Sequence, residues 1–189
     1  MFSPWLRQLL EGCPRATGAD VCRRRLRMAP ANLVESLPML GSVMYMPLAA
    51  CGSGLPQRPC KVLVETPPLA LLLRVHWLLA VSEVAVDGPR EWIDGIDRDG
   101  RPCMRLHLLP DTDYLGWDRL LARGEPALAT LHVPHLHALE AYPLRFRRHQ
   151  LAGFDVLRGE TAICLSPLGR QLAARIARAH AGQGDRQFR

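Results

Sequence analysis

Two short segments of the chain place an arginine and a histidine on either side of one apolar residue. They are Arg74-Val75-His76 and Arg105-Leu106-His107. Residues two apart in a strand point to the same face, about 7 Å apart, so each segment would present a guanidinium beside an imidazole. Arginine pairs with carboxylates through two parallel hydrogen bonds, and a neutral imidazole is a common metal ligand. If the two faces converge, the pattern predicts a site for a carboxylate-bearing ligand.

The floor of that predicted site is apolar. Leu72 and Leu78 flank the first segment, and Leu109 follows the second. A flat apolar ligand with carboxylates suits such a floor, and haem is one such ligand, with histidine as the usual axial ligand to its iron. We take His76 as the first candidate for that ligand and His107 as the second. The alternative is that one or both histidines are ordinary half-buried strand residues.

A third group of histidines lies within the sequence from His132 to His137. His135 and His137 would share a strand face and could chelate a transition metal. No Asp, Cys or fourth histidine lies close in sequence, so a plain surface strand is the alternative interpretation. Nowhere do a nucleophile, a base and an orienting acid occur in a recognisable arrangement, and nothing supports a hydrolase.

The clearest structural pattern runs from Glu91 to Leu121. Asp99-Gly100 is a strong hairpin signal, because Asp tolerates the left-handed region and Gly adopts positive φ readily. It predicts a strand on each side, the second from Cys103 to Leu109, and Pro110 is expected to end that strand. Helix N-cap residue types follow, and apolar residues then recur at helical spacing. They are the caps Asp111, Thr112 and Asp113 and the stripe Tyr114, Trp117, Leu120 and Leu121.

The order of helices, then many strands, then a late helix favours an α+β fold with a mainly antiparallel sheet. We expect one domain over 1–189, with a helical cap (1–36), a sheet core with its capped helix (37–123), and divergent closing strands with a C-terminal helix (124–189). The expected helices are 3–12, an arginine-rich 19–28, 30–36, and one that Ser166 caps before Pro167. The expected strands are 42–48, 61–65, apolar strand material over 69–86, 128–133, 136–144, and a closing hairpin of 154–157 and 161–165 that turns at Arg158-Gly159.

The chain of 189 residues carries a formal net charge of +6 and a sequence pI of about 9.4. This charge favours anionic partners such as nucleic acid, phosphate or carboxylate-bearing ligands. Nearly all of the positive charge is arginine, because Lys61 is the single lysine. The sequence has no Cys-x-x-Cys pair and no apolar run of membrane-spanning length. We expect a cytoplasmic protein with reduced thiols, without a secretory leader or a membrane span.

Taken in order, features over roughly residues 3–123 resemble the bacterial hemin-utilisation family. This family comprises the HemS/HmuS-type hemin-degrading or haem-carrier proteins and the smaller single-unit HutX/ChuX type. The shared features are a helical start, the arginine-rich helix with a short helix after it, the segment 37–46 that enters the first strand, and the 91–121 block. The residues at the family's positions in that block are Ile96-Asp97, Asp99-Gly100, Arg105, Thr112-Asp113 and Trp117.

The resemblance implies a HemS-like fold and a haem-binding cytoplasmic carrier or trafficking protein in hemin and iron utilisation. It supplies no iron ligand, because Pro47–Cys51 stands where larger members have a histidine, and Met104-Arg105 replaces a His-Lys dipeptide. The ligands are therefore assigned from the residue pattern alone. They are His76 as the axial ligand to iron, His107 in reserve, and Arg74 and Arg105 as partners of the haem propionates.

Two other functions stay open. A degenerate family member would act as a non-haem interaction or regulatory protein, an interpretation that the missing histidine motivates. A DNA-binding module would use 19–28 and 30–36 as a helix-turn-helix, although nucleic acid is the less favoured partner. Haem degradation follows from family analogy alone, because the sequence shows no redox machinery of its own. A single unit of this kind is also expected to pair with a second copy as a homodimer.

Overall fold

The computed structural model describes residues 21–48, 62–85, 88–127 and 140–184. The strands in these ranges are β1 (Val21–Arg27), β2 (Gly41–Pro47), β3 (Val62–Val64), β4 (Trp77–Ala85), β5 (Gly88–Ile96), β6 (Pro102–Thr112), β7 (Glu125–Pro126), β8 (Tyr142–Leu151) and β9 (Phe154–Thr161). The α-helices are α2 (Pro30–Ser36), α3 (Tyr114–Ala122) and α4 (Pro167–Gly184), and the 3-10 helices are η1 (Leu37–Leu40) and η2 (Pro67–Arg74).

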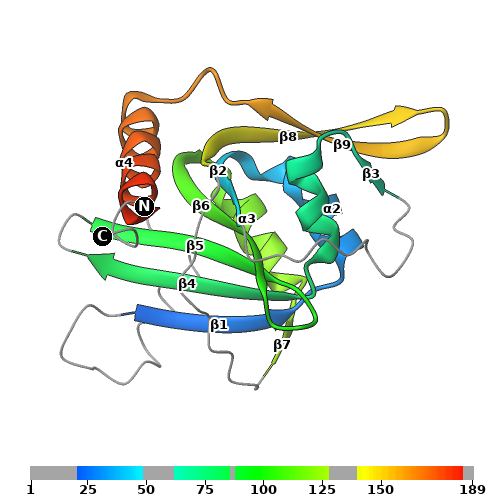
Figure 1. Ribbon diagram of the computed structural model, residues 1–189, viewed down its shortest axis with the longest axis horizontal. Helices are drawn as coiled ribbons and strands as arrows, with labels where there is room; N and C mark the ends of the chain where they lie inside the picture. The colour runs from blue at the N-terminus through cyan, green and yellow to red at the C-terminus, as the bar shows by residue number, and fades with distance from the viewer. Residues whose placement is uncertain (1–20, 49–61, 86–87, 128–139, 185–189) are drawn as a thin grey trace.

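These strands form one sheet in the order β3-β9-β8-β2-β6-β5-β4-β1-β7 (Figure 1). Every neighbouring pair is antiparallel except β3 and β9, which run parallel. The predicted fold class, α+β with a mainly antiparallel sheet, is confirmed. The longest described strand is β6, with 11 residues, and it lies near the middle of the sheet between β2 and β5.

Helices cover the sheet on both faces, and each face has its own apolar cluster. On one face α2, α3, η1 and η2 pack against the strands and form the main core. On the other face α4, which Figure 1 shows apart from α2 and α3, packs in a smaller cluster. Successive strand residues point to opposite faces, so β6 contributes to both. The main core includes Leu33, Leu72, Ile93, Leu106 and Trp117, and the smaller cluster includes Met44, Leu109, Leu165, Ala173 and Ile176.

The predicted hairpin between β5 and β6 is confirmed, and one aspartate holds its turn. Asp97 Oδ1 accepts hydrogen bonds from the backbone N–H groups of Asp99 at 2.9 Å and Arg101 at 2.8 Å. Gly100 takes a φ of +82°, a value that glycine adopts without steric cost. This local chemistry sets the register next to the turn, and a bulge between Gly95 and Ile96 then shifts it by one residue.

Three helix starts agree with the sequence. Helix α2 has the predicted bounds, Pro30–Ser36. Asp113 caps α3, because its side chain accepts from the Gly116 N–H at 2.9 Å. Ser166 caps α4, because its hydroxyl accepts from the Gly169 N–H at 3.0 Å. Each of these signals is local, which is why the sequence reveals it.

The arginine-rich segment forms strand β1 and not the predicted helix. It pairs with β4 along its whole length, which buries Leu26 in the main core. On the opposite face the Arg25 guanidinium lies 4.2 Å from the ring centroid of Trp77. Arginine is a good helix former, but strand pairing and burial override that local preference. The helix-turn-helix therefore lacks its first helix, and the DNA-binding alternative loses its structural basis.

The 3-10 helix η2 occupies the first part of the expected 69–86 strand region, and among its described residues, 69–85, only those of β4 form a strand. Two prolines begin η2, where their fixed φ suits a helical turn, and residues three apart share its buried side. Arg74 is the last residue of η2, and His76 lies in the connection to β4. The prediction that both side chains share a strand face is wrong.

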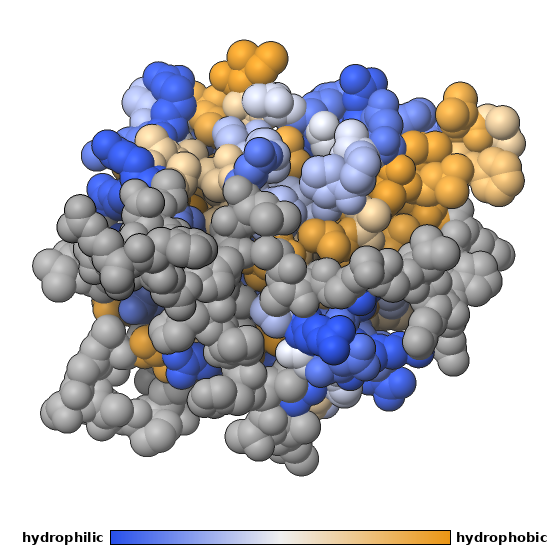
Figure 2. Space-filling view, viewed as in Figure 1, coloured by the Kyte–Doolittle hydropathy of each residue, from blue (hydrophilic) through white to orange (hydrophobic). Residues whose placement is uncertain are grey.

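The closing hairpin is longer than predicted and turns elsewhere. Leu151 faces Phe154 at its end, so the turn is Ala152-Gly153 rather than Arg158-Gly159, and Pro143 lies within β8 without breaking it. Both turn residues have positive φ, 49° and 82°, as a two-residue type I′ turn requires. Leu151 and Phe154, the residues beside the turn, are 63% and 57% exposed, and Figure 2 shows apolar surface at this end of the molecule.

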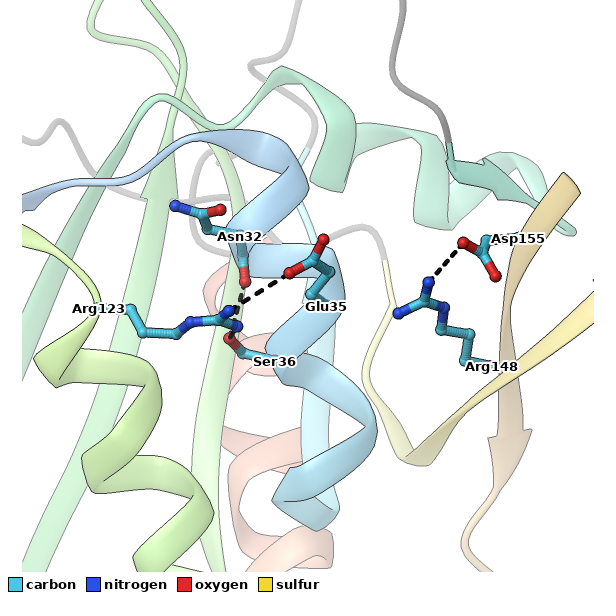
Figure 3. Close-up of polar contacts among 6 residues, drawn as sticks. All are labelled: Asn32, Glu35, Ser36, Arg123, Arg148 and Asp155. Atoms are coloured by element: carbon cyan, nitrogen blue, oxygen red, sulfur yellow. Dashed lines mark hydrogen bonds and ion pairs between the residues drawn. The ribbon is translucent and has the colours of Figure 1, made fainter.

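One arginine joins α2 to α3 (Figure 3). Arg123 donates from Nη1 to Ser36 Oγ at 2.8 Å and from Nη2 to Glu35 at 3.3 Å. The Arg148–Asp155 pair in the same view links β8 to β9 beside the hairpin turn, where both residues are solvated. The first contact reaches the buried Ser36 and fixes the two helices over the main core, whereas the second contributes little because water screens it.

We expect Ala152→Asn to stabilise the protein. A residue with a Cβ pays about 1–2 kcal/mol in the left-handed region, and Asn tolerates that region while forming the favoured Asn-Gly turn. The free energy of unfolding, measured by chemical denaturation, should rise by about 0.5–1 kcal/mol. The control Ala174→Asn, on the exposed side of α4, should lower it by roughly 0.5 kcal/mol. Destabilisation by both substitutions would contradict the strain assigned to Ala152.

Candidate functional site

Strand β6 carries a bulge around Pro110. Gly41 faces Thr112 and Val43 faces Leu108, so one residue of β2 stands opposite three residues of β6, the mark of a β-bulge. Pro110 has no N–H to offer a neighbouring strand, and the Leu109 N–H donates instead to Thr112 Oγ1 at 2.8 Å. That hydroxyl in turn donates to the Ser42 carbonyl at 2.7 Å. The prediction that Pro110 ends the strand is wrong, because the bulge satisfies its own polar groups and the strand continues.

Strands β5 and β6 separate at this bulge. From the hairpin they pair as far as Trp92, which faces His107. Beyond that pair β5 continues along β4 as far as Gly88, while β6 follows β2. In the described ranges no further residues of β5 and β6 pair with each other. The sheet therefore opens into a gap that begins at His107.

The bulge also anchors α4 across this gap. Asp111 accepts two hydrogen bonds from the helix cap, one from the Ser166 N–H at 2.7 Å and one from its hydroxyl at 2.9 Å. Gly169 lies in the first turn of α4, and a Cβ built there would stand 1.8 Å from Asp111 Oδ2. Only glycine leaves room for that carboxylate, so the start of α4 is held close against β6.

A cavity of about 370 Å³ lies between the separated strands and α4. Its volume falls within the range of small-molecule sites. Leucine and proline side chains of β6 and the apolar stripe of α4 form most of the wall, and polar groups enter at a few points. The apolar lining includes Leu108, Leu109, Pro110, Leu172 and Ile176, and the polar lining includes Arg90, Glu91, His107, Tyr114, Arg175 and His180.

His107 lies where the two strands part. It is 8% exposed, and its Nε2 has no hydrogen-bond partner among the described residues. Its ring centroid is 5.9 Å from that of Trp92. Burial, followed by the positive charges of Arg105 and His180, lowers the pKa of His107 well below its ordinary range. The imidazole is therefore neutral at pH 7, the form that ligates metals.

His180 faces His107 from α4. The two ring centroids are 6.0 Å apart with the ring planes at 55°, and His180 Nδ1 is buried without a hydrogen-bond partner in the described part of the chain. Burial lowers the pKa of His180, Arg105 lowers it further, and Asp94 opposes them. His180 is not among the candidates that the sequence pattern singles out, although it continues the four-residue spacing of the α4 stripe beyond Ile176.

Arg105 is bound to a carboxylate beside the cavity. Its Nε and Nη2 donate to the two oxygens of the buried Asp94 at 2.6 and 2.9 Å. Asp94 also accepts from Trp92 Nε1 at 3.3 Å, and the Arg105 guanidinium lies 5.1 Å from the Trp92 ring centroid. The ion pair therefore positions Trp92 against His107, while the predicted contact of Arg105 with a propionate stays a prediction.

The segment with Arg74 and His76 lies away from this cavity. Arg74 pairs with Asp97 of the hairpin turn at 3.6 Å, and the His76 ring packs against the adjacent tryptophan. The His76 N–H donates to the Ile96 carbonyl, about 13 Å along β5 from Trp92 at the usual rise of a strand. The two Arg-x-His segments are therefore not brought together, and the assignment of His76 as axial ligand stays a prediction.

Glu91 and Tyr114 add two titratable groups to the lining. Burial and the negative charge of Asp118 raise the pKa of Glu91 to about 7, against the opposing effect of the Trp117 indole. Burial, with the carboxyls of Glu91 and Asp111, raises the pKa of Tyr114. Glu91 is therefore mostly neutral in mildly acidic solution and gains a negative charge as the pH passes about 7.

The histidine group His132, His135 and His137 lies outside the described residues, as does the expected strand 128–133. Within the ranges that the structure describes, no three or more His, Cys, Asp or Glu side chains are grouped to hold a metal ion. No described helix combines the length and apolar character needed to cross a membrane.

Neither the family models nor the curated proteins contain a match to this sequence. Among solved structures, the heme degrading enzyme ChuS of Escherichia coli O157:H7 is similar at 16% identity and a TM-score of 0.41, over 60% of this chain and 38% of that one. The heme-binding protein PhuS from Pseudomonas aeruginosa, in its holo form, is similar at 20% identity and a TM-score of 0.39, over 59% and 38%. The chain spans about 38% of the length of the structures it matches.

We expect Gly169→Ala to destabilise the protein, although the same change in an ordinary helix stabilises by about 0.5–1 kcal/mol. The new Cβ would displace the Asp111 carboxylate and break its two hydrogen bonds to Ser166, at a cost of about 1–3 kcal/mol. Chemical denaturation measures the change in the free energy of unfolding.

The matched test of this contact places Gly169→Ala in an Asp111→Ala background. With the carboxylate gone, the nearest remaining neighbour of the added Cβ is Ser166 Oγ at 3.2 Å, which has to move by only a few tenths of an ångström, and the substitution should recover its ordinary stabilising sign. A double-mutant cycle of the two changes isolates the contact. A Gly169→Ala variant that stabilises the otherwise unchanged protein would show that Asp111 does not hold the start of α4.

We expect Glu91→Gln to remove a loss of stability with rising pH. The folded-state pKa of Glu91 is about 7, against an ordinary value of 4.5. Between these two values the folded protein binds more protons, so stability is full below about pH 4.5 and falls until about pH 7. Gln stays neutral, so Glu91→Gln should be more stable than the parent at pH 8 by roughly 1–3 kcal/mol. Thermal melts from pH 4.5 to 8 measure this, with the exposed Glu140→Gln as a control that should follow the parent.

Proposed function

We propose that this protein binds haem in the cavity between β5, β6 and α4 and carries it in hemin and iron utilisation. The observation that supports this most strongly is the buried Nε2 of His107, which has no hydrogen-bond partner among the described residues. A buried polar atom without a partner is rare in native proteins, and a bound ion or ligand often supplies the partner. Here the atom lies at an apolar cavity, as the axial ligand of a haem would.

The other lining residues have the chemical character that haem requires, apolar walls and positively charged side chains. The apolar walls from β6 and α4 suit the macrocycle, and Arg90 and Arg175 come from opposite sides of the cavity. Arginine recognises carboxylates through paired, charge-assisted hydrogen bonds, so these two residues would hold the propionates. When bound, haem supplies a redox-active iron, and the residues of this chain orient it and keep water from one side.

We favour carriage over degradation because the cavity has an element suited to opening. Helix α4 closes the site and rests on the smaller apolar cluster, whereas β5 and β6 belong to the main core. Segments with few buried apolar contacts open at the lowest free energy. Opening of α4 would admit and release the ligand without disturbing the sheet.

The cytoplasmic location and the homodimer stay predictions. The strands at the two described edges of the sheet, β3 and β7, have only 3 and 2 residues. Short edge strands offer few unpaired backbone groups to another chain. A second copy would therefore gain little from extending the described sheet at these edges.

We expect a haem titration of the purified protein to give a saturable Soret shift, and His107→Ala to weaken binding by at least about tenfold, or ~1.4 kcal/mol. The loss of the axial imidazole should also move the Soret band. His149→Ala, on the exposed part of β8, is the matched control and should bind as the parent does.

His76→Ala in the same titration separates the two candidate ligands. The structure favours an unchanged spectrum for this variant, because His76 lies away from the cavity. Loss of the Soret shift in His76→Ala but not in His107→Ala would assign the iron to His76, the first candidate from the sequence. Absence of any saturable shift in the parent protein would remove haem as the ligand.

A further inference from the structure

A buried imidazole, His107, and a partly buried one, His180, approach each other from different elements of the fold. His107 belongs to β6 and His180 to α4, and their ring centroids are 6.0 Å apart. Each ring has a buried nitrogen with no hydrogen-bond partner among the described residues, Nε2 in the first and Nδ1 in the second. The two rings therefore do not satisfy each other, although both line the same cavity.

The separation of the rings fits one metal ion held between them. A metal–imidazole nitrogen bond is about 2.0–2.1 Å long, and the nitrogen lies a little over 1 Å from the ring centroid. Two imidazoles on opposite sides of a metal thus have centroids about 6 Å apart. The observed 6.0 Å matches this value.

The number of ligands distinguishes haem iron from a bare ion. A bare zinc ion takes four ligands, of which three or four come from protein, and the described residues contain no grouping of three suitable side chains. Haem iron already has four ring nitrogens and needs only axial ligands from the protein. Two convergent imidazoles are a complete axial set.

We propose that His107 and His180 ligate the same haem iron, one from the sheet and one from α4. This inference rests on the proposed haem binding and assigns the second axial position to a residue that the sequence pattern did not single out. It makes α4 part of the coordination sphere and not only a cover for the cavity.

Ligation by His180 would give α4 a second point of attachment. The first is the Asp111–Ser166 contact at its start. His180 follows 14 residues later in the chain, about 21 Å along a helix at 1.5 Å per residue. With haem bound the helix would be held at both ends of this span, and without haem at its start and through its apolar stripe.

The test is the spin state of ferric haem bound to the full chain, measured by absorbance and electron paramagnetic resonance. Two strong-field imidazoles give a six-coordinate low-spin iron in the parent protein. His180→Ala should still bind haem, within about tenfold of the parent affinity, but as a high-spin species. Added free imidazole should restore the low-spin spectrum, because it replaces the missing side chain.

His180→Gln keeps most of the side-chain volume and guards against a packing defect in the alanine variant. It should also be high-spin, whereas the control His149→Ala should stay low-spin. In hydrogen exchange, haem should protect the α4 amides of the parent protein and protect them less in both His180 variants.

Each outcome separates this inference from the proposed function. A parent protein that binds haem but is high-spin overturns the paired ligation and leaves haem binding standing. Low-spin spectra in both His180 variants overturn it as well. A parent protein without a saturable Soret shift fails at the earlier step, the binding of haem itself.

Discussion

The missing N–H of Pro110 is the constraint on which the cavity depends. In the interior of a sheet a strand is expected to pair on both sides, and a proline removes one donor from that ladder. Here the chain forms a bulge. Its Thr112 hydroxyl accepts a hydrogen bond from the Leu109 N–H and donates one to the Ser42 carbonyl of β2. The side of the bulge toward β5 is left without strand pairing, so the sheet opens. An opening in the middle of a sheet has to be covered, and Asp111, the next residue, binds the helix that covers it.

On the paired side of the opening, a buried ion pair determines where the aromatic wall lies. Desolvation offsets much of the attraction between Asp94 and Arg105, so the pair adds little net stability, but loss of either partner would leave an uncompensated buried charge. The geometry therefore tolerates little movement. Since Trp92 also donates to Asp94, its indole is fixed beside His107. The pair thus specifies the position of the site more than it stabilises the fold.

The elements that the sequence predicts well are those with local signals. The Asp99-Gly100 turn, the Asp113 cap and the Ser166-Pro167 start of α4 depend on residues within four positions of one another. The Asp94–Arg105 ion pair is different, because Asp94 comes to face Arg105 only after a bulge between Gly95 and Ile96 shifts the strand register by one residue. The local features recur in the structure because neighbouring backbone groups have few other ways to be satisfied.

The errors come from interactions between distant segments. The arginines of 21–27 favour a helix locally, yet the segment pairs with β4, some fifty residues away in the chain. Pro110 resembles a strand end in the sequence, because its role in the bulge depends on β2 and α4. The repeated Arg-x-His pattern predicts one shared face, but Arg74 and Arg105 each bind a carboxylate of the β5–β6 hairpin. Long-range pairing of this kind leaves no periodic trace in a single sequence.

The site is divided between a strand of the main core and a helix held by a smaller apolar cluster and by one contact at its start, and this division bears on how it would work. His107 is fixed by β6 and the main core, whereas His180 is carried by a helix with a small apolar contact. Among the described residues two buried nitrogens have no hydrogen-bond partner at this contact, and the cost of leaving them unpaired favours separation of the helix from the sheet. When a ligand satisfies both nitrogens, the same contact becomes favourable. A ligand shifts a conformational equilibrium only by binding the two states with unequal affinity. A ligand that needs both imidazoles would bind more tightly when α4 is closed on the sheet than when it is separated from it.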